Sequence, residues 1–232
     1  MQNHSFQRCN NYLLALSDIQ SHSSIMEKKK KRIFVSDFDG TLTTKDSMFE
    51  IIVYKQGLFG LVWAMICLLP WLLLMVLKKY PKQRTKERLL YRCFKNMNEK
   101  EFREFCFAFA LENHRIIRKD LYNHLLKEKK KGTEVIVITA SPEIWVRAFL
   151  PHEITVLGTR LNFENGILQP HFSGKNCRGR EKVNRLLEFL PDIEKNRSEY
   201  YITAFGDSSG DASLIQFSDE GHWVRKGFEI HE

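Results

Sequence analysis

The sequence predicts an α/β fold in which an open parallel sheet carries a large, mainly helical insertion. Three short apolar runs, each followed at once by polar or turn residues, have the pattern of buried parallel strands. Between the first and the second run lies a long segment, residues 47–126, whose apolar side chains recur at helical spacing. A sheet interrupted by a helical insertion accounts for both observations.

The strands are expected at residues 33–37, 134–139 and 200–205. In a parallel α/β sheet the carboxyl ends of the strands meet at the edge where ligands bind. The first run ends at Asp37, the second at Thr139, and the third continues into Gly206. We therefore expect the polar residues that follow the three runs to share one site.

The remaining elements after the insertion are two helices and a hairpin. The helices are expected at residues 144–150 and 181–190, and Pro191 ends the second. Asn165 and Gly166 form a dipeptide that favours a two-residue hairpin turn within residues 154–172.

The net charge of +8 is unevenly distributed along the chain. Residues 1–32 carry 6 basic and 2 acidic side chains, residues 78–131 carry 17 basic and 7 acidic, and the remainder carries 13 basic and 19 acidic. The positive middle region indicates either a surface that faces a polyanion or a solvated, lysine-rich helical face. Because no strand interleaves aromatic and basic residues, we expect no nucleic acid partner.

The five cysteines are odd in number and have no metal-ligand spacing, which favours a reducing compartment. Residues 1–31 are expected to form a disordered basic tail that ends in four lysines. Its apolar run, residues 12–16, is too short for a signal peptide. Either Met1 or Met26 is compatible with the start of translation.

Four carboxylates follow the expected strands. Asp37 and Asp39 lie two positions apart in DFDGTLT, and Asp207 and Asp211 belong to GDSSGD. Carboxylates gathered at one sheet edge repel one another unless a cation lies among them. A set of ligands made only of oxygen atoms favours Mg²⁺ over zinc. The sequence therefore predicts a magnesium site.

With these motifs in this order, the chain resembles the haloacid dehalogenase superfamily of phosphohydrolases. The motifs are DFDGTLT from Asp37, Thr139 in VITAS, Lys182 in GREKV, and GDSSGD from Gly206, and they span residues 33–211. Lys175 is the alternative to Lys182. The resemblance implies a Rossmann-like catalytic core (32–46 and 127–232) and an inserted helical cap (47–126).

The resemblance also implies a mechanism. Asp37 would attack phosphorus and form a phospho-aspartyl intermediate, while Asp39 would act as general acid and then as general base. Thr139 and Lys182 would bind the phosphoryl oxygens. The alternative role for Thr139 is to cap the next helix, and Ser141 is a rival for that cap. Mg²⁺ would be held by the Asp37 carboxylate, the Asp39 carbonyl and Asp207, supported by Asp211 and Ser208. Cys177 is interpreted as structural.

Residues 58–77 contain no charged side chain and are long enough to cross a bilayer as one helix. We expect this segment to contact a membrane from the cytoplasmic side; the alternative is a helix buried over the active site. A single crossing would separate Asp37 from Thr139, so the segment must return to its starting side, with a break at Pro70, or lie in the interface. The basic residues that follow would then face anionic headgroups.

Three functions are compatible with the sequence. The cap resembles that of the phosphoserine phosphatase subgroup, but Asp46 stands where those enzymes usually carry glutamate, and their carboxylate-binding arginine is not evident. The apolar segment instead resembles the phosphatidylglycerophosphatase C type, so a lipid phosphate such as phosphatidylglycerophosphate is the preferred substrate. A soluble small-metabolite phosphatase is the alternative. A non-catalytic phosphate-binding or membrane-scaffolding protein is the third hypothesis.

Overall fold

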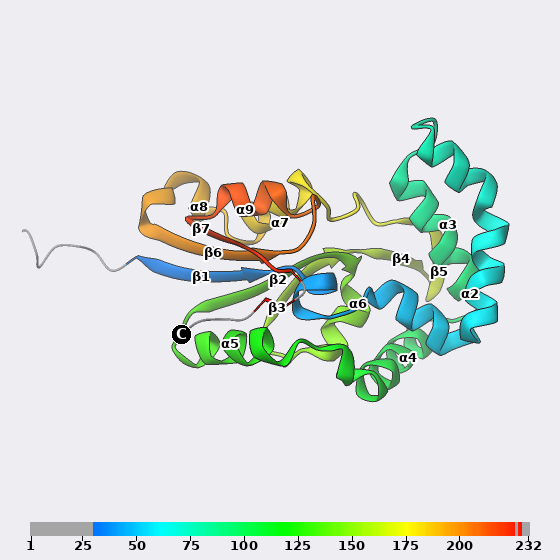
Figure 1. Ribbon diagram of the computed structural model, residues 1–232, viewed down its shortest axis with the longest axis horizontal. Helices are drawn as coiled ribbons and strands as arrows, with labels where there is room; N and C mark the ends of the chain where they lie inside the picture. The colour runs from blue at the N-terminus through cyan, green and yellow to red at the C-terminus, as the bar shows by residue number, and fades with distance from the viewer. Residues whose placement is uncertain (1–29, 226, 229–232) are drawn as a thin grey trace, which may run out of the picture.

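The computed structural model describes residues 30–225, 227 and 228 and shows a five-stranded, fully parallel sheet (Figure 1). The strand order is β3-β2-β1-β6-β7. The strands are β1 (Lys31–Ser36), β2 (Glu134–Pro142), β3 (Thr155–Thr159), β6 (Tyr200–Gly206) and β7 (Glu220–Trp223). The predicted α/β fold with a parallel sheet is confirmed. The expected tail lies almost wholly outside the described residues.

Helices cover both faces of this sheet, as Figure 1 shows. They are α5 (Lys119–Lys130), α6 (Glu143–Val146), α7 (Arg180–Phe189), α8 (Asp192–Lys195) and α9 (Ala212–Phe217), with the short turns η1 (Phe38–Leu42), η2 (His114–Ile116), η3 (Arg147–Phe149) and η4 (Arg197–Glu199). Successive side chains of β1 alternate between the faces. Phe34 joins the core under α5, while Ile33 and Val35 join the core under α7 and α9.

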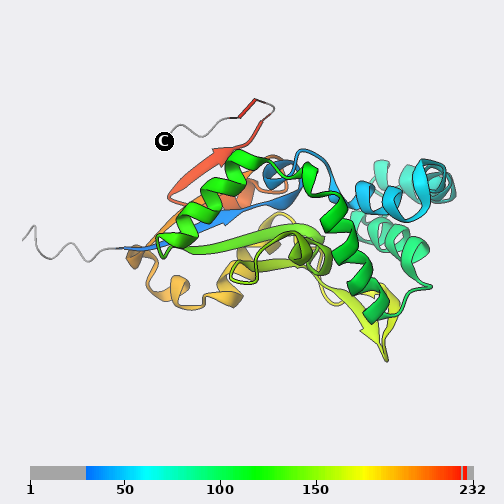
Figure 2. The ribbon, with the colours of Figure 1, turned by 90° about the horizontal axis from the view of Figure 1, so that it is seen from below.

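The insertion contains three helices and contacts a separate hairpin. The helices are α2 (Ser47–Val76), α3 (Lys82–Phe94) and α4 (Glu99–Glu112), and the hairpin strands are β4 (Leu161–Glu164) and β5 (Ile167–Phe172). The hairpin turns at Asn165 and Gly166, which both have positive φ, as predicted. Figure 2 shows these elements together at one end of the molecule.

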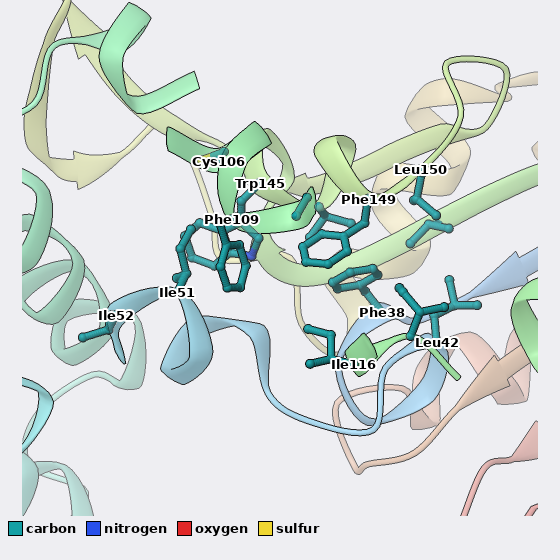
Figure 3. Packing of buried hydrophobic residues seen from close by; sticks show 14 of the residues in the cluster. Phe38, Leu42, Ile51, Ile52, Cys106, Phe109, Ile116, Trp145, Phe149 and Leu150 are labelled. Carbon is teal, nitrogen blue, oxygen red and sulfur yellow. The ribbon is translucent and has the colours of Figure 1, made fainter. Parts of the chain in front are cut away.

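The insertion is anchored to the core by a cluster of large apolar side chains (Figure 3). The ring of Phe38, from η1, lies tilted against that of Phe149 with centroids 5.5 Å apart, and Phe149 meets Phe109 of α4 edge to face at 5.4 Å. Ile51 and Trp145 are fully buried in the same cluster. Since η1 carries the first acidic motif, this cluster holds that motif and the insertion in a fixed relation.

Helix α5 lies along the sheet beside β2 (Figure 1). Leu121 and Leu125 are fully buried there. We therefore propose that the cap comprises α2, α3 and α4, and that the core resumes with α5, several residues earlier than the boundary at residue 126 drawn from the sequence.

Helix α2 breaks at Gly57, not at Pro70 as the sequence predicted. Gly57 has φ 71° and ψ 174°, a conformation that is accessible only to glycine. The helix then continues through Pro70 to Val76, turns at residues 77–81, and returns as the antiparallel α3. The chain therefore reverses direction after α2.

The apolar part of α2 is exposed. Among the described residues α2 is the one helix long and apolar enough to cross a membrane, and only 11% of its most apolar 18-residue window is buried. The exposed large apolar side chains of α2 are Phe49, Leu58, Phe59, Val62, Trp63, Ile66, Leu69, Leu73, Leu74 and Val76. A helix buried over the active site is therefore excluded.

Candidate active site

The first and the last acidic motifs meet at the carboxyl ends of β1 and β6. These neighbouring strands lie where the strand order reverses, since the chain moves outward from β1 through β2 and β3 and then returns to β6. The Asp37 amide donates to the Phe205 carbonyl at 2.9 Å. A Cβ atom on Gly40 would lie 2.2 Å from Asp207 Oδ2, so only glycine allows the two turns to approach so closely.

Lys182, from the first turn of α7, connects these motifs. Its Nζ donates to Asp37 Oδ1 and Asp211 Oδ1, both at 2.5 Å, and to the Ile138 carbonyl at 2.8 Å. Lys182 is 1% exposed. Burial alone would lower its pKa, but the charges of Asp37 and Asp211 outweigh burial and raise it. Lys175, the alternative considered from the sequence, is exposed and outside the site.

Asp211 orients Lys182. Its Oδ2 accepts hydrogen bonds from the amides of Asp207 and Ser208, at 3.2 and 3.0 Å, and from Ser208 Oγ at 3.1 Å. Burial would raise the pKa of Asp211, but Lys182 and these donors keep it below its ordinary value. Asp211 is therefore a fixed anion beneath the lysine.

The carboxylates of Asp37, Asp207 and Asp211 have oxygens within 4.8 Å of one another. Burial raises the pKa of Asp37 to about 7, and the charges of Asp211 and Asp39 add to this against the opposing effect of Lys182. Burial and Asp211 also raise the pKa of Asp207. A divalent cation would relieve this repulsion, and the oxygen donors suit Mg²⁺. The residues therefore fit the predicted metal.

Asp39 directs its carboxylate away from this group and toward the insertion. Its Oδ1 accepts from the Ser47 amide at 2.7 Å, and its Oδ2 accepts from Ser141 Oγ at 2.5 Å. Ser47 opens α2, and its hydroxyl accepts from Trp145 Nε1 at 3.0 Å. The orientation of Asp39 thus depends on the start of α2 and on the end of β2.

Thr139 and Ser141 occupy different positions on β2. Thr139 is fully buried, and its Oγ1 accepts from the Ser141 amide at 3.0 Å. Ser141 lines the cavity beside Asp39. The sequence analysis assigned phosphate contact to Thr139 and considered Ser141 only as a helix cap, so it missed the hydrogen bond from Ser141 to Asp39.

A cavity of about 620 Å³ opens above these residues. Lys182 and Ser208 line it together with five aspartates, the four described above and Asp46. The sequence analysis missed several further lining residues: Lys45, Met75, Lys82, Lys86, Asn176 and Arg178. Lys86 reaches from α3 to the Ala140 carbonyl, at 2.9 Å. The basic character of residues 82–88 was visible in the sequence, but which of these side chains turn toward the carboxylates depends on how α3 packs.

Cys177, beside α7, is fully buried. Burial raises the pKa of its thiol to about 11, so the thiol stays protonated and unreactive at neutral pH. This agrees with the structural role expected for it.

Comparison with known proteins identifies the family. The family model for haloacid dehalogenase-like hydrolases matches residues 34–216, most of the chain. The chain belongs to the haloacid dehalogenase-like hydrolase family. It is also 32% identical over 206 residues to Protein CicA of Caulobacter vibrioides (strain NA1000 / CB15N), with 84% of each chain covered. The expected enzyme class, a hydrolase, is confirmed by the family.

Solved structures share the fold of this hydrolase at low sequence identity. A protein of unknown function from Bordetella pertussis Tohama I has a TM-score of 0.68 and 14% identity, over 83% of this chain and 89% of that one. A phosphoserine phosphatase, solved as a phospho-aspartyl intermediate analogue, has a TM-score of 0.53 and 18% identity, over 84% and 86%. Cytosolic 5'-nucleotidase IIIB bound to cytidine has a TM-score of 0.55 and 17% identity, over 86% and 74%.

Proposed function

We propose that this hydrolase cleaves phosphate monoesters through a phospho-aspartyl intermediate on Asp37. The observation that carries the proposal is the buried Lys182 held between Asp37 and Asp211, with Asp207 beside them. Such a cluster has an excess of negative charge and a cavity above it, which suits binding of a cation together with a phosphoryl group. The phosphoserine phosphatase and the nucleotidase named above are phosphatases of similar fold.

In the first step, a carboxylate oxygen of Asp37 attacks phosphorus, and the bond from phosphorus to the ester oxygen breaks. Asp39 gives its proton to the departing oxygen, which leaves as an alcohol. The Ser47 amide and the Ser141 hydroxyl hold Asp39 in place for this transfer. Lys182 Nζ contacts Asp37 directly and offsets negative charge at the phosphoryl group.

In the second step, a water molecule gives a proton to Asp39 and attacks phosphorus, and the acyl phosphate bond to Asp37 breaks. Inorganic phosphate leaves, and Asp37 is restored as a carboxylate. Mg²⁺, held by the Asp37 carboxylate, the Asp39 carbonyl and Asp207, would supply the positive charge that lets two anions approach. Thr139, behind the cavity wall, is proposed to support the phosphoryl-binding end of β2.

We further propose that the substrate is a lipid phosphate at the cytoplasmic face of a membrane. One observation favours this substrate: the α2–α3 hairpin both carries the exposed apolar surface and walls the active-site cavity, through Met75, Lys82 and Lys86. An exposed apolar surface of this extent marks a contact with lipid or protein. The residues from Leu58 to Val76 form a helix about 28 Å long, so this apolar surface is extensive enough to lie along a membrane interface.

A soluble phosphorylated metabolite is the second candidate, because the solved neighbours include phosphoserine phosphatases. One experiment separates the two candidates. Phosphate release is measured with Mg²⁺ on phosphatidylglycerophosphate and related lipid phosphates in detergent micelles, and on phosphoserine and other soluble monoesters. We expect faster release from the lipid phosphates, and loss of activity by at least about 10⁴-fold in Asp37→Asn. Faster release from a soluble monoester would refute the lipid assignment, and full activity of Asp37→Asn would refute the mechanism.

The membrane contact has its own test. Trp63 and Leu73 are 62% and 57% exposed, so replacing both by glutamine removes apolar contact without opening the core. We expect vesicle binding of the double variant to fall by at least about 100-fold, because each apolar side chain contributes about 1.5–3 kcal/mol on leaving water. Phe189→Gln, at a 42% exposed position on α7, is the control. Equal vesicle binding by the double variant and the control would refute the contact.

A further inference from the structure

A second cleft lies on the opposite side of α3 from the active site. Lys82 and Lys86 line the catalytic cavity, whereas Arg84, Arg88 and Arg92 line the second cleft. Residues two positions apart on a helix point about 200° apart, so α3 presents one basic face to each space. The second cleft has a volume of about 430 Å³ and lies between α2, α3 and the end of β5.

One arginine of this cleft, Arg88, is held by aromatic side chains. Arg88 Nε donates to the Tyr80 hydroxyl at 2.8 Å, and its guanidinium lies 4.5 Å from the centre of the Trp71 ring. Arg92 follows one turn later, and among the described residues neither its side chain nor that of Lys95 makes a hydrogen bond or an ion pair. An aromatic floor with arginines above it suits a phosphate group, which arginine binds through paired hydrogen bonds.

The cleft has an excess of positive charge. Its lining carries four basic side chains, Arg84, Arg88, Arg92 and Lys95, and one acidic side chain, Glu87. Glu87 is buried, and it accepts hydrogen bonds from the Phe172 amide, Gln83 and Arg84. Because these donors occupy the Glu87 carboxylate, it does not neutralise the positive charges of Arg88, Arg92 and Lys95 within the cleft.

The cleft is continuous with the exposed apolar surface of α2. Trp71 belongs to the cleft, and Leu74, about one turn later on the same side of α2, is 39% exposed. A ligand that satisfies both surfaces needs a negative charge for the arginines and a hydrocarbon part for α2. Tryptophan and tyrosine are also the residues that favour the boundary between headgroups and hydrocarbon.

We propose that this second cleft binds the phosphate headgroup of an anionic phospholipid and thereby holds the α2–α3 hairpin on an anionic membrane surface. The headgroup would contact Arg88 and Arg92 over the Trp71 ring, and the acyl chains would lie along α2. This site is separate from the catalytic cavity and does not depend on the proposed chemistry.

The experiment measures binding of the full chain to vesicles of phosphatidylcholine, with and without phosphatidylglycerol. The cleft variant is Arg88→Gln with Arg92→Gln, and the control is Lys100→Gln with Lys130→Gln, two exposed lysines outside the cleft. Each basic residue near an anionic surface contributes about fivefold, so the cleft variant should lose roughly 30-fold in affinity for the phosphatidylglycerol vesicles. The control should lose much less.

Two further measurements test whether the loss of vesicle binding comes from the cleft and not from misfolding or from the active site. Arg92→Gln alone leaves the contacts of Arg88 intact, so its expected loss of about fivefold cannot come from misfolding. Hydrolysis of p-nitrophenyl phosphate without vesicles should be unchanged in the cleft variant, and Asp37→Asn should still bind the vesicles.

The proposal is overturned by equal losses in the cleft variant and the control, which would indicate net charge alone. It is also overturned if soluble glycerol phosphate displaces the wild-type chain from the vesicles, since the ligand would then be a soluble phosphate.

Discussion

Three side chains with almost no contact to solvent, Asp37, Lys182 and Asp211, form the centre of the candidate active site. Their order in the chain was visible in the sequence because each follows a strand or opens a helix. The hydrogen-bond partner of the Asp39 carboxylate could not be predicted from the sequence. Ser141 reaches Asp39 only because β2 extends to Pro142 and α2 begins at Ser47, and both facts depend on packing.

Replacing Lys182 by methionine should destabilise the fold. The change leaves Asp37 and Asp211 buried without their shared cation, and breaking a buried pair in this way costs about 3–5 kcal/mol. The free energy of unfolding, measured with urea, checks this. Lys175→Met, at an exposed position, is the control and should unfold as the wild type does. A Lys182→Met variant as stable as the wild type would show that the ion pairs contribute nothing.

Replacing Ser141 by alanine should lower kcat by about 10–100-fold with little effect on KM. The change removes the 2.5 Å hydrogen bond to Asp39, and a hydrogen bond to a charged group contributes about 1.5–3 kcal/mol. Ser141→Thr keeps a hydroxyl and should recover much of the rate. Kinetics with p-nitrophenyl phosphate measure both variants. If threonine restored nothing, Ser141 would act through packing and not through its hydroxyl.

Helix α3 joins the parts of the cap, because Lys86 faces the catalytic cavity, Arg88 faces the second cleft, and Glu87 holds the hairpin. The charge of residues 78–131 indicated a polyanion or a solvated face, but the division of α3 into two basic faces could not be read from composition. The break in α2 was misplaced for a related reason. In a sequence, proline is a stronger signal of a helix break than glycine. In the structure, however, the break in α2 occurs at Gly57, because glycine can adopt a positive φ.

The contact between Glu87 and β5 predicts an effect of pH on stability. Burial would raise the pKa of Glu87, but hydrogen bonds from Gln83, the Phe172 amide, His171 and Arg84 together lower it below 4.5. A carboxyl whose pKa is lower in the folded state stabilises the fold above its unfolded pKa, and this contribution disappears as the pH falls through the folded pKa.

Glu87→Gln should therefore lower the free energy of unfolding at about pH 7, and the difference from the wild type should shrink toward about pH 3. Urea unfolding across this range measures it. Glu188→Gln, at an exposed position on α7, controls for the loss of one charge. A difference that stayed constant with pH would show that the carboxylate of Glu87 is not the stabilising group.

Across the chain as a whole, the catalytic half was easier to predict than the cap. Buried parallel strands can be recognised in a sequence as short apolar runs. Because the carboxyl ends of such strands lie at the same edge of the sheet, Asp37, Thr139 and Asp207 could be placed together at that edge. The cap has no comparable rule. A buried position remained an alternative for its apolar helix, and only the packing of α3 and the β4–β5 hairpin shows that most of the surface of that helix is exposed.

In the proposed mechanism Asp37, at the junction of β1, β6 and α7, carries the phosphoryl group during turnover. The most direct test is a rapid acid quench of the enzyme with Mg²⁺ and radiolabelled p-nitrophenyl phosphate, followed by mapping of the labelled peptide. We predict an acid-stable, alkali-labile label on Asp37 that is absent from Asp37→Asn. A label on another residue, or turnover with no labelled enzyme at any time, would contradict the account.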